Sequence, residues 1–515
     1  MITNFLILFK KSPLLAFIKY ESTFLTGSLA VYLSAPVPAN HSGRQGEAGG
    51  SGAWGELSPP SPASSVRIFS NRHRHSFTCF GNCTHITYNL YMNYHIWTIG
   101  CQMNKAESNA ISEYLESRGF RPTDVLSDAN LVVINTCVVR QHAEDKIKSL
   151  LGYVNQIKSR QPDKQVVVTG CFVGNNKESL IKRYPFVNAF IPPGDLTSFK
   201  EWHELCGLQP STFQLPKRSA KVSAYVPIMQ GCDNFCSYCI VPYRRGREVS
   251  RPLDEIVNQV KDLVINGIKE VILLGQNVNS YGKNLCPSVD LASLIKLLDG
   301  IDGLSRVRFL TNHPRDMSSD LIDVMAASKK VCHHICLPLQ SGDNLILSQM
   351  NRHYSYEQYC KLIMDMRTAM PDISFSTDII VGFPGETSAQ FDNTVKAITE
   401  IHFDAVHVAS YSPRPETQAH RSFADDVPSE EKQARLHRIE QIQKSILQEI
   451  NNGLVKSELE ILVEGKKKSK CYGRTYHDKL VFIEPDDARE GSLVQVMIES
   501  ATPWSLQGRV VPNPD

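Results

Sequence analysis

The feature that most constrains the fold is a repeated alternation of strand-like and helix-like segments through the middle of the chain. Short apolar runs typical of buried strands alternate with longer stretches whose apolar residues recur at helical spacing. This pattern predicts a parallel sheet covered by helices. The repeat occurs six times, fewer than the eight units of a closed barrel, so we expect an open, partial (β/α)6 barrel with room for a large substrate. The strand-like segments are Val222–Met229, Glu270–Leu274, Arg306–Leu310, His334–Leu339, Phe375–Val381 and Ala405–Ser410, and the clearest helical stretches are Leu253–Ile265, Leu291–Leu298, Tyr356–Met366 and Ser388–Glu400.

A polar or glycine- and proline-containing motif follows each strand-like segment. Any one of them could be an ordinary loop. In a barrel of parallel strands, however, all six fall at the carboxyl ends, which form the catalytic face. The motifs occupy residues 231–239, 275–282, 311–314, 338–342, 382–386 and 411–415.

The first motif contains three cysteines in the pattern CxxxCxxC, namely Cys232, Cys236 and Cys239. Three thiolates can hold three irons of a 4Fe–4S cube, which leaves the fourth iron open to another ligand. The alternative is a structural zinc site, but such a site usually has four ligands arranged as CxxC pairs. No second pair stands nearby in the sequence. The loop therefore indicates an iron–sulfur cluster with one open iron.

Three more cysteines stand directly after strand-like segments in the N-terminal part of the chain. Tyr94–Ile99, Leu131–Asn135 and Gln165–Thr169 alternate with helical stretches at Lys105–Arg118 and Glu144–Ser159, which predicts an open parallel α/β sheet. Ligands of such sheets bind beyond the carboxyl ends of the strands, so cysteines at three strand ends should converge. Buried core cysteines are the alternative, although these would stand within a strand. We expect a second cluster on Cys101, Cys137 and Cys171.

The C-terminal part of the chain differs in texture. Glu430–Ile450 reads as a charged connecting helix, and the short strand-like runs after residue 451 predict a small β-barrel. Cations interleaved with aromatic side chains suit an RNA backbone and its bases. Residues 451–515 nevertheless hold nine Lys and Arg against ten Asp and Glu, so the lysine run could be only a solvated hairpin. The side chains concerned are Lys466, Lys467, Lys468, Lys470, Tyr472, Arg474 and Tyr476.

Composition limits the class of protein further. The formal net charge of the 515-residue chain is +2, so nucleic-acid binding must rest on local patches rather than on overall basicity. Its 14 cysteines are spread through a long chain, unlike those of a short secreted disulfide scaffold. Iron–sulfur ligands in a reducing cytoplasm fit better. No apolar run reaches the length of about 18 residues that a membrane-spanning helix needs.

The first 91 residues carry no convincing helical or strand period. They are either a targeting or disordered extension, or a mis-called start, with translation beginning at Met92, directly before the first strand-like segment. We favour the second interpretation. The expected domains are an N-terminal sheet domain over 92–208, the partial barrel over 218–449 and the small β-barrel over 451–514.

With these residues assembled, the chain resembles the radical S-adenosylmethionine (AdoMet) methylthiotransferase family over about residues 92–511. The N-terminal domain is similar to the family's cysteine-bearing domain, and the tail resembles a TRAM domain, an RNA-binding barrel. The stretches Val241–Pro252 and Gly275–Gly282 are most similar to the branch that acts on N6-dimethylallyladenosine in tRNA. The chain departs from the family at Glu416, where glycine is usual, and at Asn312, where serine is usual.

The resemblance implies two 4Fe–4S clusters and AdoMet as cofactors. Cys232, Cys236 and Cys239 would hold the cluster that generates a radical from AdoMet. Cys101, Cys137 and Cys171 would hold the auxiliary cluster that delivers a methylthio group to carbon 2 of the adenine beside the anticodon. Tyr238 stands where the family places an aromatic ring against AdoMet, although it could equally shield the cluster. Further candidates for the AdoMet pocket, chosen by their position at strand ends, are Gln276, Asn277, Gln340 and Asp378.

The resemblance also implies partners. The substrate would be tRNA, with phosphate contacts from Arg244, Arg245, Arg247 and the tail lysines, so that binding would depend on salt. An electron donor such as flavodoxin or ferredoxin and a source of sulfur or clusters are expected, and the enzyme should be a monomer without a membrane partner. Two alternatives remain: the same chemistry on an aspartate of ribosomal protein S12, whose branch usually has Gln-Asp-Thr in the 275–282 loop, and a non-catalytic, metal-stabilised RNA-binding protein.

The remaining cysteines match no ligand pattern. Cys332 and Cys336, with His333 and His334 between them, resemble a metal site in isolation. They fall at the start of a barrel strand, away from the expected catalytic face, so we interpret them as packing residues. The others are Cys206, Cys286, Cys360 and Cys471.

Overall fold

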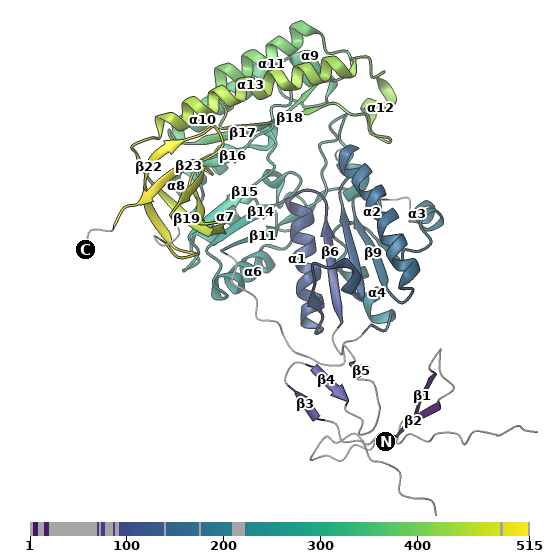
Figure 1. The fold of residues 1–515 in the computed structure, drawn as a ribbon. Coiled ribbons are helices and arrows are strands. Elements are labelled where there is room, and N and C mark those ends of the chain that lie inside the picture. The colour runs from purple at the N-terminus through teal and green to yellow at the C-terminus, as the bar shows by residue number, and fades with distance from the viewer. Residues whose placement is uncertain are drawn as a thin grey trace, which may run out of the picture. The chain divides into compact units, whose positions relative to one another are not determined.

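The structure, a computed structural model, describes residues 92–138, 141–174, 177–208, 222–484 and 488–512, together with five short strands nearer the N-terminus (Figure 1). These strands form two small antiparallel sheets, one of β1 (Asn4–Leu8) and β2 (Leu15–Lys19), the other of β3 (Phe69–Asn71), β4 (Arg74–Phe77) and β5 (Ile86–Thr87). The sequence had predicted no strand here, because strands this short barely establish a period of two. The other predictions for residues 1–91 fall largely on residues outside the described ranges.

The N-terminal domain is a five-stranded parallel sheet in the order β10-β9-β8-β6-β7. The strand order reverses between β6 and β8, which makes their carboxyl ends the topological switch point of the sheet. Strand β8 is buried along its whole length, as expected of an apolar run covered on both faces by helices. The elements are β6 (Asn93–Thr98), α1 (Gln102–Ser117), β7 (Arg121–Pro122), β8 (Leu131–Thr136), α2 (Gln141–Arg160), β9 (Gln165–Gly170), α3 (Lys177–Arg183), β10 (Ala189–Ile191) and α4 (Leu196–Leu205).

The middle domain is the expected open barrel of six parallel strands. Strands β11, β14 and β15 form one parallel sheet, and β16, β17 and β18 form another. A parallel bridge between Val307 and Val331 connects the two sheets. The strands are β11 (Ser223–Pro227), β14 (Glu270–Leu274), β15 (Arg306–Phe309), β16 (His334–Cys336), β17 (Ser374–Val381) and β18 (Ala405–Ser410), and a short antiparallel pair, β12 (Met229–Gln230) with β13 (Val249–Ser250), follows β11.

Helices cover the outside of the barrel and enclose one large apolar core. Helix α13 packs against α11 and β18, and Figure 1 shows α11 and α13 side by side across the outer face of the second sheet. The buried ion pair between Arg435 on α13 and Glu386, at 2.7 Å, fixes this connecting helix to the barrel. The helices are α5 (Val241–Arg245), α6 (Leu253–Ile265), α7 (Leu291–Asp299), α8 (Ser319–Ala327), α9 (Asn344–Gln349), α10 (Tyr356–Ala369), α11 (Ser388–Ile401), α12 (Gln418–Ser422) and α13 (Ser429–Gly453).

The C-terminal domain is a closed β-barrel in the order β19-β20-β21-β23-β22. Closure leaves no sheet edge free to pair with another chain. Its core is a small set of aliphatic side chains that includes Ile461, Val481 and Val496. The strands are β19 (Glu458–Lys467), β20 (Lys470–Thr475), β21 (Leu480–Ile483), β22 (Leu493–Ala501) and β23 (Leu506–Val510), of which β20 and β23 were not predicted.

The C-terminal barrel covers the amino ends of the middle-domain strands. Arg306, at the start of β15, donates to the carbonyl of Arg474 at 2.6 Å and pairs with Glu460 at 3.0 Å. Arg308 donates to the carbonyl of Thr475 at 2.7 Å and pairs with Glu270 at 2.8 Å. Buried guanidinium groups are tolerated because each is paired and hydrogen-bonded. The carboxyl ends of the strands are therefore the end left for chemistry. Among the described residues, none of the helices combines the length and apolarity that a membrane span requires.

We expect Gly170→Ala to destabilise the N-terminal sheet. Gly170 ends β9 with φ of +93°, and a Cβ there would stand 2.3 Å from the carbonyl oxygen of Thr136. The clash and the left-handed backbone should lower the free energy of unfolding by about 2 kcal/mol or more, measured by guanidinium titration. Gly152→Ala is the control, because Gly152 lies on α2 with open space around it and alanine should stabilise that helix slightly. Equal stability of the two variants would contradict the prediction.

Candidate iron–sulfur site

The three N-terminal cysteines lie together at the switch point of the sheet. The strand register places Thr98 opposite Asn135 and Asn135 opposite Thr169, so the residues just beyond these strands are neighbours. The amide of Cys171 donates to the carbonyl of Thr136 at 2.9 Å. A Cβ on Gly100 would stand 2.6 Å from the Cβ of Cys137. The fold therefore places Cys101, Cys137 and Cys171 at neighbouring strand ends.

A buried amide pair holds these strand ends. Asn104, on the first turn of α1, donates to the side-chain oxygen of Asn135 at 2.8 Å and to the carbonyl of Thr136 at 3.0 Å. Asn135 returns a bond to the carbonyl of Asn104 at 2.9 Å, and the Cys101 thiol donates to Asn104 at 3.2 Å. Both asparagines are fully buried. A satisfied polar network of this kind rigidifies the loops that carry the thiols.

Arg245 reaches this cysteine group from the middle domain. Its side chain is only 3% exposed and pairs with Glu107 at 2.6 Å. Burial raises the pKa of the Cys171 thiol, and the nearby Arg245 guanidinium opposes that rise. The expectation that Arg245 contacts a tRNA phosphate is therefore wrong, because the side chain is committed to the interior. An arginine in the sequence Arg244-Arg245-Gly246-Arg247 gives no sequence signal of its burial.

Two further arginines border the same region. Arg244 pairs with Glu416 at 2.9 Å and lies against Gly174, three residues after Cys171. Arg414 is buried and lies 3.6 Å from Glu144. Glu416 has φ of +78°, a left-handed conformation that explains why glycine suits this position and that is unusual for glutamate. Guanidinium groups next to thiols favour the thiolate form, which is the form that binds metal. The residues present therefore fit an anionic cluster.

The CxxxCxxC loop lies between β12 and α5 and is fixed by backbone hydrogen bonds. The amide of Cys239 donates to the carbonyl of Cys236 at 2.9 Å, and that of Cys232 donates to the carbonyl of Gly246 at 3.2 Å. Burial raises the pKa of the Cys232 thiol to about 11 and that of Cys239 to about 12. Because bound thiolates must lose their protons, metal binding here would release protons. Ser237, inside the loop, donates its amide to the carbonyl of Met350 at 3.0 Å.

Arg352 is a site residue that the sequence analysis missed. It is buried and donates to the Cys236 sulfur at 3.3 Å, to the carbonyl of Pro338 at 3.0 Å and to the Tyr354 hydroxyl at 3.0 Å. A cation aimed at a cluster thiol favours its thiolate form. Arg352 stands beyond α9, outside every motif that the strand ends suggested, so nothing in the sequence distinguishes it from a surface arginine.

The spacing of the cysteines bears on the zinc alternative. Around one tetrahedral zinc ion, ligand sulfurs stand about 3.8 Å apart, since each Zn–S bond is about 2.3 Å. Within the described ranges, the one group of three metal-ligating atoms within 4.8 Å of one another is that of His333, Asp372 and His477, so neither cysteine set is that compact. In a 4Fe–4S cube each thiolate binds a different iron.

Four of the five residues predicted for the AdoMet pocket follow strands of the barrel, whereas Asp378, expected at a strand end, lies within β17. Tyr238 packs against an apolar cluster that contains Phe383. Gln276 accepts a hydrogen bond from the amide of Gly231 at 2.6 Å and so supports the cysteine loop. The side chain of Asn277 donates to the Asp316 carboxylate at 2.8 Å. Gln340 is buried with φ of +73°, and its amide donates at 2.9 Å to the carbonyl of Asp378 in β17.

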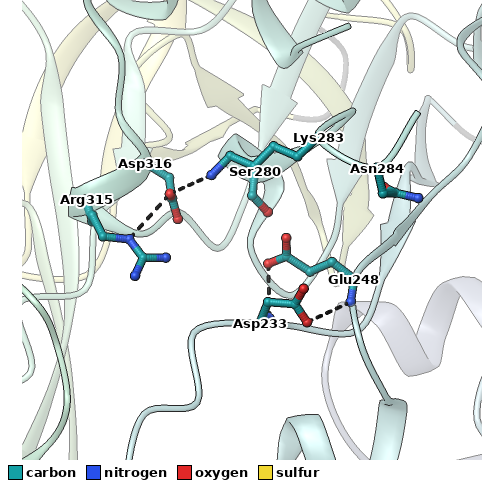
Figure 2. A pocket seen from close by; sticks show the side chains of 7 residues that line it. All are labelled: Asp233, Glu248, Ser280, Lys283, Asn284, Arg315 and Asp316. Carbon is teal, nitrogen blue, oxygen red and sulfur yellow. Dashed lines mark hydrogen bonds and ion pairs between the residues drawn. The ribbon is translucent and has the colours of Figure 1, made fainter. Parts of the chain in front are cut away.

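A polar cavity of about 240 Å³ opens beside the cysteine loop (Figure 2). Lys283 pairs with Asp316 at 2.8 Å, and Arg315 lies 3.6 Å from the same carboxylate. Asp233, directly after Cys232, lies beside Glu248 and accepts from its amide at 3.2 Å. None of these charged residues was singled out in the sequence. The remaining lining residues are Ser280 and Asn284.

An open α/β barrel with a CxxxCxxC loop beyond its first strand is the architecture of radical AdoMet enzymes, and residues 226–398 match the family described as the Radical SAM superfamily. Residues 93–192 match the uncharacterized protein family UPF0004, and residues 454–511 match the TRAM domain. A solved radical AdoMet methyltransferase, TsrM from Kitasatospora setae with cobalamin and a [4Fe-4S] cluster bound, has 13% identity, a TM-score of 0.48 and coverage of 64% of this chain and 77% of its own.

Curated relatives cover most of the chain. A tRNA-2-methylthio-N(6)-dimethylallyladenosine synthase of Dehalococcoides mccartyi is 50% identical over 418 residues, which are 81% of this chain and 98% of the relative. Proteins of the same name from Dictyoglomus thermophilum and Moorella thermoacetica are 41% and 39% identical, over 82% and 81% of this chain and 99% and 98% of their own lengths. The chain belongs to the family of tRNA-2-methylthio-N(6)-dimethylallyladenosine synthases.

We expect the neighbouring arginines 245 and 247 to behave differently when replaced by methionine. Arg245→Met leaves the Glu107 carboxylate buried without its partner, which should lower the free energy of unfolding by about 3 kcal/mol. Arg247→Met removes a side chain that is 73% exposed, so its unfolding curve should match that of the wild type. Guanidinium titrations of the two variants test this, and equal effects would contradict the assigned burial.

Proposed function

We propose that this enzyme methylthiolates carbon 2 of N6-dimethylallyladenosine beside the anticodon of tRNA. The observation that carries the proposal is the contact between the two cysteine loops. Ile240, the residue after Cys239, packs against Cys171 and against Val138, the residue after Cys137. A buried apolar contact thus joins the two loops that carry the thiols. Such closeness suits a reaction in which a radical and a sulfur donor meet at one substrate atom.

The chemistry explains why two sets of thiols are needed. Carbon 2 of adenine has an unactivated C–H bond. Side chains that act as acids or bases cannot replace its hydrogen with sulfur. When bound, two 4Fe–4S clusters and AdoMet supply the radical and the methylthio group, and the protein positions them. We assign Cys232, Cys236 and Cys239 to the radical-generating cluster, and Cys101, Cys137 and Cys171 to the auxiliary cluster.

The chain's own residues would orient these groups and exclude water. Arg352 would orient the Cys236 thiol, to which it donates, and Arg245 lies near Cys171 and Cys101 of the other set. Tyr238, Gln276, Asn277, Gln340 and Asp378 remain our candidates for contacts to AdoMet. The polar cavity beside Asp233 adds Lys283, Arg315 and Asp316 as groups that would bind a zwitterionic or hydroxyl-bearing part of a ligand.

We assign tRNA binding to exposed cations and aromatic groups. Lys466, Lys467 and Lys468 are exposed on the hairpin between β19 and β20, and Trp504 is 64% exposed between β22 and β23. Arg247 is exposed beside the cysteine loop. Phosphate contacts of this kind weaken as salt rises. We also propose that the enzyme is a monomer. It would act with an electron donor, such as flavodoxin or ferredoxin, and with a source of sulfur.

The proposed substrate is tested by mass spectrometry of digested tRNA from cells with and without this gene. We expect deletion to abolish 2-methylthio-N6-dimethylallyladenosine and to accumulate its unthiolated precursor. Re-expression of the wild-type chain should restore the modified nucleoside, whereas a Cys236→Ala chain should not. Unchanged tRNA, with loss of the modified aspartate in ribosomal protein S12 instead, would refute the assignment.

The two-cluster assignment predicts iron content. Cys171→Ala should lower iron in the reconstituted protein from about eight to about four atoms per chain, while reductive cleavage of AdoMet continues and methylthiolation stops. Cys206→Ala is the control, because Cys206 ends α4 outside both sets. Full iron content in Cys171→Ala would contradict the second cluster.

A further inference from the structure

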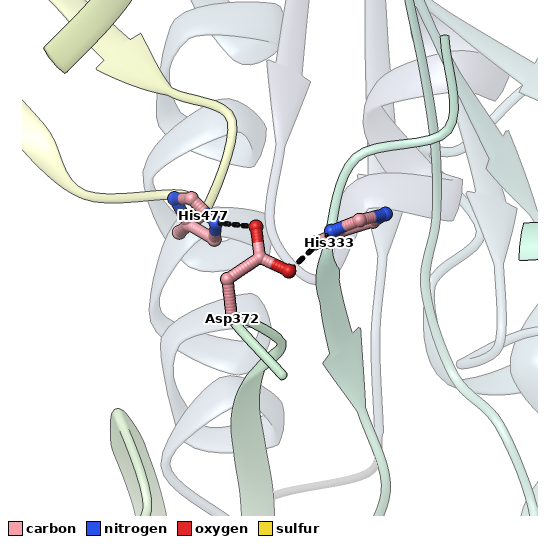
Figure 3. A group of neighbouring side chains, drawn as sticks. All are labelled: His333, Asp372 and His477. Atoms are coloured by element: carbon pink, nitrogen blue, oxygen red, sulfur yellow. Dashed lines mark hydrogen bonds and ion pairs between the residues drawn. The ribbon is translucent and has the colours of Figure 1, made fainter. Parts of the chain in front are cut away.

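A group of three metal-ligating side chains lies far from both cysteine sets, where the middle domain meets the C-terminal barrel (Figure 3). The carboxylate of Asp372 reaches two imidazoles at once, with one oxygen 2.7 Å from Nδ1 of His333 and the other 2.9 Å from Nε2 of His477. All three ligand atoms lie within 4.8 Å of one another. His333 precedes β16, Asp372 precedes β17, and His477 lies in the turn after β20.

The backbone around these three residues is fixed. Ser374, the first residue of β17, donates its amide to the carbonyl of His333 at 2.9 Å. Its hydroxyl lies 3.1 Å from the carbonyls of both His333 and His477, so one serine links the two histidine segments. The ring of Tyr476 packs edge-on against the His333 ring with centroids 5.0 Å apart, and its hydroxyl donates to the carbonyl of Val331. The histidines are therefore held in place by their supports.

The group has the ligand types of a metal site and is accessible to solvent. Two imidazoles and a carboxylate are a ligand set that divalent zinc accepts, with a fourth position left for water. The histidine side chains are 17% and 28% exposed, whereas that of Asp372 is 54% exposed, so solvent reaches the group from the carboxylate side. Ligand atoms around tetrahedral zinc stand about 3.4 Å apart. The two nitrogen–oxygen separations, 2.7 and 2.9 Å, would widen by about 0.5–0.7 Å to reach this spacing.

We propose that His333, Asp372 and His477 bind a zinc ion that fastens the C-terminal barrel to the amino end of the middle domain. Two ligands come from the middle domain and one comes from the C-terminal barrel. A ligand bound only when the two domains are docked stabilises the docked arrangement by mass action. The sequence analysis interpreted His333 as a packing residue. Its ligand role could not be predicted there, because neither Asp372 nor His477 is near it in sequence.

The test uses cluster-loaded full-length protein equilibrated with Zn²⁺ and then freed of excess metal. We expect about one zinc per chain in the wild type, bound through nitrogen and oxygen at about 2.0–2.1 Å in zinc-edge X-ray absorption. Zinc displaced onto the cysteine sets would instead show sulfur at about 2.3 Å. Iron content is measured in parallel, so that loss of a cluster cannot be mistaken for gain of a zinc site.

Variants then locate the ion. His477→Asn and Asp372→Asn should each lose that zinc, whereas His437→Asn, which alters an exposed histidine on α13, should retain it. Zinc should also raise the thermal unfolding temperature of the wild type and of His437→Asn, but not that of the other two. Equal zinc in all four proteins, absence of bound zinc in the wild type, or coordination by sulfur alone would overturn the proposal. The absorption measurement on the wild type decides even if a variant fails to fold.

Discussion

The buried ion pair between Arg245 and Glu107 is the contact on which the arrangement of the two cysteine sets depends. Arg245 ends the short helix that follows the CxxxCxxC loop, and Glu107 lies on the helix that begins just after Cys101. A charge buried this deeply is stable only when its partner is in place. The pair therefore fixes one loop relative to the other, and the packing of Ile240 on Cys171 fills the space beside it. Both are contacts between domains.

The two ends of the central barrel differ in their contacts and in their backbone conformation. Arg306 and Arg308 seal the amino ends against the C-terminal barrel through carbonyl and carboxylate partners. The carboxyl ends instead carry backbone strain. Phe235, Thr311 and Gln340 have positive φ angles there, although none is glycine. Left-handed backbone at non-glycine residues persists only where surrounding structure enforces it, and it concentrates at functional sites.

Sequence periodicity predicted the strands and helices well where burial dictates it. The stretches Glu270–Leu274 and Leu253–Ile265 form a strand and a helix with the predicted bounds, because their apolar patterns match the faces that the core covers. Short edge strands such as Arg121–Pro122, and the strands Lys470–Thr475 and Leu506–Val510, escaped prediction. Two-residue edges and half-polar barrel strands have no pattern to read. Their pairing depends on neighbours that are distant along the chain.

The sequence by itself determined the chemistry, because ligand identity and strand-end position are local properties. Cys101, Cys137 and Cys171 stand beyond parallel strands, and parallel strands must bring their carboxyl ends to one edge. Tertiary structure alone decided which charges accompany them. The side chain of Arg245 is buried against Glu107, and Arg352, which follows α9, donates to Cys236. His333 lies next to Asp372 and His477. A charged side chain has the same sequence signature in solvent and in the interior. Only the partners brought by the fold determine whether it is buried.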